Sequence, residues 1–196
     1  AGDDSGAPNP YGESKLSGEK IIRARPSSYD WTIVRPCSIW GPGFGEPYKR
    51  FFELVSERKF FVTAQMADRK SFGYVGNSVF QIEKLLFSPK EKVSRKIFYI
   101  GDKPPLSISG WSDQIAEAFE VKKPVRMPSI FLRGAAVIGD VLSTFGFKFP
   151  VTSFRLKNMT TNHVVPLASL YEVVGAPPYS VSEGVKQTVS WMNERK

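Results

Sequence analysis

Short β-branched and aromatic runs alternate with longer stretches of helical spacing, and this alternation constrains the fold most. Residues 31–35 and 96–100 are typical of buried strands, and residues 60–63, 72–75 and 124–127 are typical of shorter ones. Helical patterns cover residues 10–25, 47–58, 77–87, 107–119, 128–145, 167–174 and 182–193, and residues 36–45 are predicted to be a loop. The order indicates an α/β protein with some parallel strand pairing, built as part of a sheet with a helical cap.

Composition and cysteine usage narrow the class of protein. The chain has 196 residues, of which 41% are hydrophobic, with one cysteine, Cys37, and one histidine, His163. An internal disulfide and a multi-histidine metal site are therefore excluded, and both residues are expected to be structural. No apolar run reaches the ~18–20 residues of a membrane span, and no signal-peptide pattern is present. These features favour a soluble, cytoplasmic, metal-free protein.

The net charge of +8 allows an acidic partner of several kinds. Nucleic acid, a membrane surface and a small anion such as a nucleotide are all compatible with a basic chain. The basic residues are scattered along the sequence, and their densest run, residues 90–96, is short and contains Glu91. We therefore expect a small-molecule partner and neither a nucleic-acid nor a membrane partner.

The first candidate for chemistry is the pair Tyr11 and Lys15. Four residues separate them at a predicted helix start, so both side chains share one helix face. A nearby ammonium stabilises the phenolate form of a tyrosine, which can then accept the proton of a substrate alcohol. The same spacing recurs at Tyr99 and Lys103, but that pair crosses a strand end and a Gly-Asp turn. Spacing alone is therefore a weak signal.

Sequence context strengthens the interpretation of this pair. Residues 9–19, Asn-Pro-Tyr-Gly-Glu-Ser-Lys-Leu-Ser-Gly-Glu, resemble the active-site helix of the extended short-chain dehydrogenase/reductases, the NAD-dependent epimerase/dehydratase family. Residues 32–42 are similar to the family's strand and loop beside the nicotinamide. Residues 69–77 resemble its substrate-side segment, and residues 177–191 resemble its C-terminal helix. The resemblance implies the C-terminal part of a Rossmann-like doubly wound sheet, with a small and mostly helical substrate-binding lobe.

The resemblance also implies roles in catalysis and cofactor binding. Tyr11 is expected to be the catalytic acid/base, and Lys15 is expected to hold the nicotinamide ribose and to favour the tyrosinate. Pro36, Cys37 and Ile39 are expected to contact the nicotinamide of NAD or NADP. No metal ligand is implied.

Substrate and partner contacts follow from the same resemblance. Ser38 occupies a position that often contacts a nucleotide-sugar substrate. Arg69 or Lys70 corresponds to the arginine that binds the substrate pyrophosphate, because cations form charge-assisted hydrogen bonds with phosphate oxygens. The family's usual homodimer would use the helix that carries Tyr11 and Lys15, and we expect it as one possible assembly.

The family's glycine-rich dinucleotide turn is absent from the sequence. The segment Gly41-Pro-Gly-Phe-Gly45 has Glu46 where the third glycine of that motif belongs, and it follows the tyrosine motif instead of preceding it. The chain is therefore interpreted as a C-terminal portion. We expect residues 1–46 to be a remnant of the NAD(P)-binding domain. Residues 47–196 would form the substrate-binding lobe, interleaved with the last Rossmann strand at about 96–101.

Three functions remain open at this stage. The first is a nucleotide-sugar epimerase or dehydratase. The second is an oxidoreductase for a hydrophobic alcohol or ketone, because residues 128–132, 138–142 and 149–152 resemble 3β-hydroxysteroid dehydrogenase and dihydroflavonol reductase. The third is a non-catalytic binding module.

Overall fold

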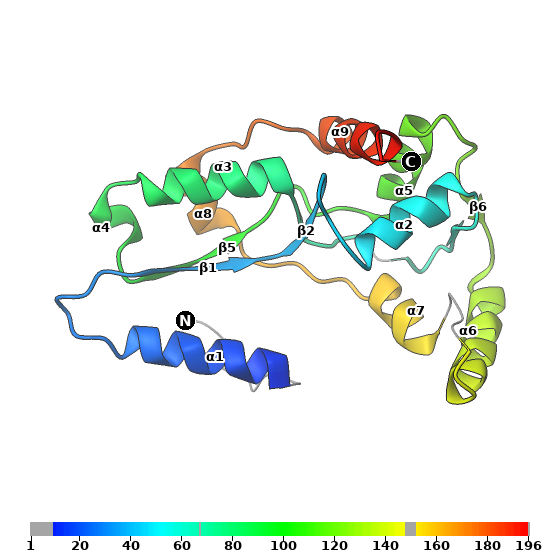
Figure 1. Cartoon of the computed structure of the whole chain (residues 1–196), viewed down its shortest axis with the longest axis horizontal. Coiled ribbons are helices and arrows are strands. Elements are labelled where there is room, and N and C mark those ends of the chain that lie inside the picture. Colours follow the sequence, from blue (N-terminus) through cyan, green and yellow to red (C-terminus); the bar gives the residue numbers. More distant parts are fainter. Residues whose placement is uncertain (1–9, 67, 148–151, 196) are drawn as a thin grey trace.

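A computed structural model describes residues 10–66, 68–147 and 152–195 (Figure 1). Asn9 of the tyrosine motif and residues 149–151 of the steroid-dehydrogenase-like segment lie outside these ranges. The helices are α1 (Pro10–Arg23), α2 (Tyr48–Ser56), α3 (Val75–Leu86), α4 (Lys90–Val93), α5 (Ile108–Ala118), α6 (Ser129–Thr144), α7 (Ser153–Thr160), α8 (Ala168–Val174) and α9 (Val181–Asn193). The strands are β1 (Thr32–Pro36), β2 (Ser38–Trp40), β3 (Phe61–Val62), β4 (Phe72–Tyr74), β5 (Lys96–Ile100) and β6 (Val125–Arg126).

Parallel pairing, predicted from the alternation of strands and helices, is confirmed. Strand β1 pairs with β5 from Thr32 opposite Lys96 to Pro36 opposite Ile100. Strands β2 and β4 form a second parallel pair, and β3 and β6 form a third. The Cys37 amide donates to the Ile100 carbonyl at 2.8 Å, so β5 also holds the backbone between β1 and β2. All three pairs run parallel, as an α/β fold requires.

Two hydrophobic clusters form the core. The larger one is aromatic and is centred on Trp40 and Trp111, whose ring centroids lie 5.0 Å apart. Strands β2 and β4 and helices α2, α5 and α9 contribute to it. The smaller cluster packs Phe98 and Ile100 of β5 against Leu170 of α8. These clusters fix the carboxyl ends of the strands, where ligands bind in open α/β sheets.

Helix α1 stands apart from both clusters. None of its residues is buried, and the figure shows it running beneath β1 in the opposite direction (Figure 1). Its contact with the sheet is an ion pair in which the Arg35 guanidinium donates to both carboxylate oxygens of Glu19, at 2.8 and 2.6 Å. A helix held by side-chain pairing, without apolar burial, depends strongly on that pair.

Helix α3 buries mainly polar side chains and exposes apolar ones. Val79, Ile82 and Leu86 have helical spacing, but all three are exposed. The buried side chains of the helix are Asn77, Ser78, Gln81 and Leu85. Its inner face is polar because it hydrogen-bonds to the loop that follows β5.

Several element boundaries differ from the predictions. The loop predicted over residues 36–45 contains strand β2, whose partner β4 is distant in sequence. Helices α4 and α7 were not predicted. The last helix is capped by Ser180 and not Ser182, because only Ser180 has a glutamate at the capping-box spacing, Glu183. The predicted strand 96–100 is confirmed. Of the two serines that could cap α5, Ser107 and Ser109, Ser107 is the cap, and its hydroxyl accepts from the Gly110 amide.

Candidate functional site

Tyr11 and Lys15 lie together on one face of α1. The Lys15 Nζ atom is 5.3 Å from the centroid of the Tyr11 ring, so the predicted helical juxtaposition is present. Tyr11 is 73% exposed, and its phenol is open to a ligand. The pair can therefore present a phenol and an ammonium to the same substrate atom.

The ion pair between Glu19 and Arg35 sets the level of this pair along the sheet. Eight residues of helix separate Glu19 from Tyr11, a rise of about 12 Å. From Arg35 to Ser38 the extended chain advances by about 10 Å. Because α1 and β1 run in opposite directions, the amino-terminal end of α1, which carries Tyr11, lies at the same end of the sheet as β2, which begins at Ser38 (Figure 1). Arg35 also donates to the Tyr99 hydroxyl at 3.0 Å, which fixes the guanidinium.

A cavity of about 400 Å³ opens at this end of the sheet. Four of the predicted site residues line it together. They are Pro36, Cys37, Ser38 and Lys70, and the remaining lining residues are Ser71, Phe72, Tyr99, Asn158, Thr161, His163 and Val165. Its volume falls in the range of ~300–1,000 Å³ that small-molecule sites occupy. Residues 36–38 and 70 thus form one site although the sequence separates them widely.

Burial tunes two ionisable groups on the cavity wall. Burial, followed by the negative charge of Asp102, raises the pKa of the Cys37 thiol to about 11, so the thiol is neutral at physiological pH. Burial also lowers the pKa of Lys70. The Lys70 Nζ donates to the Asn158 carbonyl at 2.5 Å and so is held at the wall. An anion in the cavity would meet a cation that is already partly desolvated.

A buried polar network supports the cavity from behind. One Asp102 carboxylate oxygen accepts from the Tyr74 amide at 2.7 Å, and the other accepts from the Asn77 side chain at 3.0 Å. Burial raises the Asp102 pKa, against the opposing effect of these hydrogen bonds. The Gln81 amide exchanges two hydrogen bonds with the backbone of Gly101. The network fixes the end of β5, on which Cys37 rests.

Gly101 lies where a side chain would make tight contacts with its neighbours. A Cβ atom at this position would be 3.1 Å from the Cys37 sulfur and 3.2 Å from the Phe72 carbonyl oxygen. Both distances are tighter than ordinary contacts, so the absent side chain lets β4, β5 and the Cys37 backbone approach closely.

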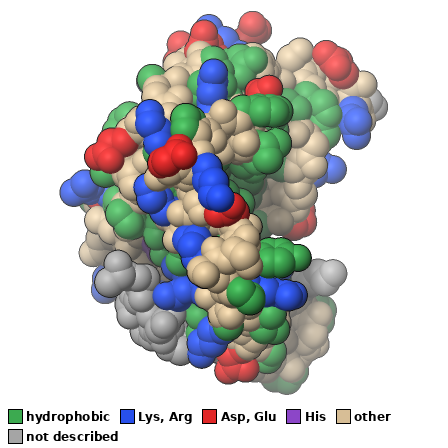
Figure 2. All heavy atoms as spheres, turned by 90° about the vertical axis from the view of Figure 1, so that its left-hand side faces the viewer, with side chains coloured by type: hydrophobic (Ala, Val, Ile, Leu, Met, Phe, Trp, Pro, Cys, Tyr) green, Lys and Arg blue, Asp and Glu red, His purple; other side chains and the backbone are tan. Residues whose placement is uncertain are grey.

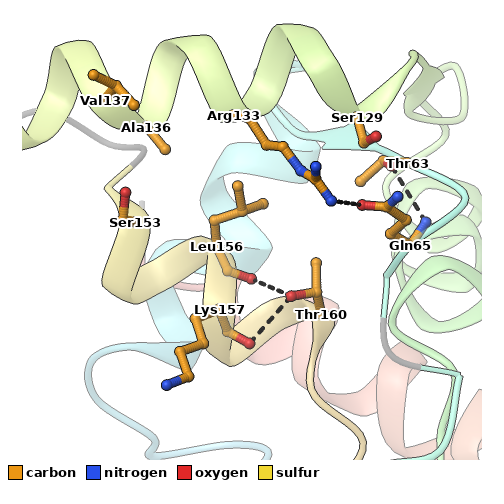
Figure 3. Close-up of a pocket in the computed structure, with 10 residues that line it drawn as sticks. All are labelled: Thr63, Gln65, Ser129, Arg133, Ala136, Val137, Ser153, Leu156, Lys157 and Thr160. Atoms are coloured by element: carbon orange, nitrogen blue, oxygen red, sulfur yellow. Dashed lines mark hydrogen bonds between the residues drawn. The ribbon is translucent and has the colours of Figure 1, made fainter.

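A second cavity, of about 370 Å³, lies between α6, α7 and the end of β3 (Figure 3). Its wall is rich in hydroxyl groups and contains two cationic residues, Arg133 and Lys157. Arg133 donates to the Gln65 side-chain oxygen at 3.0 Å, and Thr160 bonds back to its own helix (Figure 3). Sequence reasoning did not identify this cavity, because its walls come from three separate segments.

The remaining predicted residues are placed differently. Neither Ile39 nor Arg69 lines the first cavity, and Arg69 is exposed. Of the two predicted phosphate-binding cations, the structure therefore puts Lys70 at the cavity. Tyr99, Asn158 and Thr161 line it without having been predicted. The backbone of His163 forms an isolated parallel β-bridge with that of Lys70, and the His163 amide donates to the Arg69 carbonyl at 3.0 Å.

Charge around the α1 end of the molecule forms no single patch. Figure 2 shows Lys and Arg side chains there interspersed with Asp, Glu and apolar groups. Among the described residues, no helix is both long and apolar enough to span a bilayer.

Sequence comparison finds curated relatives that include an epimerase and a dehydrogenase. No protein-family model matches the chain. It is 24% identical over 93% of its length to the N-acetyl-alpha-D-glucosaminyl-diphospho-ditrans,octacis-undecaprenol 4-epimerase of Escherichia coli. It is 26% identical over 94% of its length to the decarboxylating sterol-4-alpha-carboxylate 3-dehydrogenase of Saccharomyces cerevisiae. An uncharacterized protein of Sinorhizobium fredii is 28% identical over 92% of the chain.

Solved structures show the same fold at lower identity. The UDP-glucuronic acid 4-epimerase of Bacillus cereus, in complex with UDP-glucuronic acid and NAD, superposes with a TM-score of 0.66 at 16% identity. The superposition covers 100% of this chain and 57% of the epimerase. The epimerase Mth375 of Methanothermobacter thermautotrophicus superposes with a TM-score of 0.66, and the superposition covers 56% of that protein.

The fold is thus that of the C-terminal half of a Rossmann-like epimerase. The chain spans about half the length of the curated relatives it matches, 53–56%. These similarities confirm the resemblance to the NAD-dependent epimerase/dehydratase family of the extended short-chain dehydrogenase/reductases. A C-terminal portion of such a protein accounts for both the coverage and the fold.

The residues at the first cavity fit one end of a nicotinamide dinucleotide. Cys37 and Pro36 offer a neutral, partly apolar wall at the carboxyl end of parallel strands, which suits a nicotinamide ring. Within the described residues, β2 is followed by the glycine-rich turn of residues 41–45 and then by α2, but Glu46 stands where the third glycine of a dinucleotide-binding turn belongs.

Proposed function

We propose that this chain forms the substrate side of an NAD(P)-dependent nucleotide-sugar epimerase or dehydratase. The observation that carries the proposal is the pairing of Tyr11 with Lys15 on a helix held level with the cavity of Cys37, Ser38 and Lys70. Tyr11 and Lys15 are not among the residues that line this cavity. In the proposal, a ligand that fills the cavity extends to α1, where Tyr11 is the proton acceptor. In this proposal, residues 1–46 belong to the cofactor domain and residues 47–196 to the substrate lobe.

The reaction assigns a distinct task to each residue. The ammonium of Lys15 stabilises the phenolate form of Tyr11, which accepts the proton of a sugar hydroxyl and becomes a neutral phenol. The nicotinamide, when bound beside Pro36, Cys37 and Ile39, supplies hydride-transfer chemistry. Tyr11 must remove the proton from the hydroxyl oxygen as the hydride leaves the carbon that bears this hydroxyl.

In this proposal, the substrate binds at the part of the cavity wall that contains Ser38 and Lys70. Ser38 offers a hydroxyl to the sugar, and Lys70 offers its ammonium to a phosphate oxygen. Arg69, exposed next to Lys70, is the second cation available to a diphosphate. The E. coli relative is named for a diphospho-linked sugar and the B. cereus structure holds UDP-glucuronic acid, and both support an anionic sugar substrate.

A second candidate function keeps the chemistry and changes the substrate. The yeast relative is a sterol dehydrogenase, and α6 carries an apolar outer face. These observations favour an oxidoreductase acting on a hydrophobic alcohol or ketone, in which Tyr11 would still accept the hydroxyl proton.

Ligand-induced thermal stabilisation separates the two substrates. A ligand that binds only the native state raises the apparent melting temperature with concentration. UDP or dTDP should stabilise the protein, and Lys70→Met should abolish most of that shift. Lys49→Met, in the exposed first turn of α2, is the matched control. A shift with a sterol but with neither nucleotide would favour the second substrate, and no shift with any of them would favour a binding module for another ligand.

Assembly through α1 is a further part of the proposal. Ile21 is 64% exposed and Ile22 41%, so the helix carries unburied apolar side chains that a second copy could cover. We expect Ile21→Lys to shift a dimer towards monomer in analytical ultracentrifugation. A monomeric wild-type protein would remove the dimer from the proposal without affecting the reaction.

A further inference from the structure

Helix α6 has an apolar side that faces solvent in addition to the side that packs against the core. Its buried positions are Leu132, Ala136 and Gly139, and they lie on one side at spacings of three and four residues. Six apolar side chains face outward, and each is more than half exposed: Ile130, Phe131, Val137, Ile138, Val141 and Phe145. We refer to these six residues as the outer face of α6.

The outer face forms a continuous apolar stripe. At 3.6 residues per turn, its members fall on the side of the helix opposite Leu132 and Ala136. Gly134 is the only other residue in the centre of that side, so no charged group interrupts it. Contiguous apolar patches of this kind are uncommon on monomeric proteins and mark interaction sites.

Val125, Phe147 and Phe154, on segments next to α6, are also exposed, whereas a second group of exposed apolar residues lies elsewhere. Ile21 of α1, Val34 of β1 and Leu86 of α3 are also exposed, but their elements lie at the end of the molecule away from α6 (Figure 1). Strand β1 pairs only with β5 among the described strands, so its free edge is at that end too. The α6 outer face is therefore a separate surface.

The sequence around α6 holds most of the chain's net positive charge. Residues 122–157 contain seven of the 27 Lys and Arg residues and one of the 19 Asp and Glu residues, a net charge of +6. The other 160 residues share the remaining +2 of the total of +8. Lys122 and Lys123 are exposed just before β6, and Lys157 is exposed on α7, which packs against α6. An apolar helix face with basic flanks is the pattern of helices that lie in the surface of an anionic bilayer.

We propose that the outer face of α6 docks the protein onto anionic lipid membranes. The six apolar side chains enter the boundary between headgroups and acyl chains, while the exposed lysines of the neighbouring segments meet lipid phosphates. Helix α6 also forms a wall of the cavity that contains Arg133 (Figure 3). Docking would therefore bring that cavity to the lipid surface. The inference goes beyond the proposed reaction and does not require it.

This surface differs from the expectation drawn from charge alone. The basic residues were judged too scattered for a membrane partner because their runs are short. In the fold, however, the basic segment and the apolar stripe belong to neighbouring elements, and the sequence does not show that the apolar residues of α6 face outward.

Vesicle flotation tests the inference directly. We expect the full chain to float with vesicles of equimolar phosphatidylglycerol and phosphatidylcholine. It should bind vesicles of phosphatidylcholine alone at least tenfold more weakly, and high salt should weaken binding to the anionic vesicles. Ile138→Glu with Val141→Glu, at the centre of the stripe, should reduce the bound fraction at least tenfold. Lys122→Glu with Lys123→Glu should reduce binding to anionic vesicles only.

A matched control tests the location. Val79→Glu with Leu86→Glu places the same two charges on the exposed side of α3 and should leave vesicle binding unchanged. The inference is overturned if wild type does not float, or if the α6 and α3 variants bind equally. It is also overturned if wild type is a dimer that the α6 variant converts to monomer, because the stripe would then join two copies. Circular dichroism of each variant establishes that the fold is retained.

Discussion

Replacing Asn77 tests the polar network behind the first cavity. Its side chain donates to Asp102 at 3.0 Å and to the Tyr179 carbonyl at 2.8 Å, and it accepts from the Tyr179 amide at 3.0 Å. Each hydrogen bond contributes ~1 kcal/mol net, so Asn77→Ala should lower the free energy of unfolding by about 3 kcal/mol. The exposed neighbour Val79→Ala should change it by less than ~0.5 kcal/mol.

Asn77→Asp should be distinguished from Asn77→Ala by its dependence on pH. It retains an acceptor for the Tyr179 amide but brings a second carboxylate against Asp102, whose pKa burial already raises. Two charges at 4 Å repel by ~4 kcal/mol at an effective dielectric constant of 20. The folded state would then raise the carboxyl pKa values above their unfolded ones, so the loss of stability is full at neutral pH and declines as pH falls.

Urea unfolding followed by tryptophan fluorescence measures both effects, since Trp40 and Trp111 are buried in the core. At pH 7, Asn77→Asp should be at least as destabilised as Asn77→Ala. At pH 5 the gap between Asn77→Asp and wild type should narrow more than the gap for Asn77→Ala. An Asn77→Asp protein as stable as wild type at pH 7, or a gap independent of pH, would refute the network as described.

Three further predictions follow from other contacts. Glu19→Gln should lower the free energy of unfolding by about 1–2 kcal/mol at pH 7. The hydrogen bond from Arg35 lowers the pKa of Glu19 from its ordinary value of 4.5. The difference in stability from wild type should therefore decline as pH falls below 4.5 and vanish once Glu19 is protonated in the folded protein. Gly184→Ala should lower stability by ~1–3 kcal/mol in urea unfolding, since its Cβ would lie 2.8 Å from a Tyr74 ring carbon; a stabilised variant would contradict the packing. Cys37 should react with iodoacetamide at pH 8 at least ~100-fold more slowly in the native protein than in urea, because its pKa is raised to about 11, and equal rates would disprove its burial.

Local sequence signals predicted most of the regular elements. Strand β5 and the Ser107 cap of α5 follow from β-branched content and capping chemistry, which depend on neighbouring residues. Strand β2 was missed because it exists through pairing with β4, which lies more than 30 residues away in sequence. The polar inner face of α3 was missed for the same reason, since Asn77 and Gln81 find their partners on other elements.

The candidate site was predictable to a similar extent. The Tyr11 and Lys15 pair is local, and its geometry follows from helical spacing. That Lys70 and not Arg69 reaches the cavity depends on which way each side chain leaves the backbone next to His163, and sequence position does not set that. The apolar stripe of α6 was visible as an apolar stretch, but only the fold shows that it faces outward.

The most direct test of the central claim is the turnover of Tyr11→Phe in the full-length protein, with ligand binding measured alongside. If Tyr11 is the proton acceptor, kcat should fall by ~10²–10⁴-fold while the nucleotide ligand binds with unchanged affinity. Tyr29→Phe, at an exposed turn before β1, should leave both quantities unchanged. A Tyr11→Phe enzyme whose kcat stays within about twofold of wild type would contradict the assignment of this chain's acid/base residue.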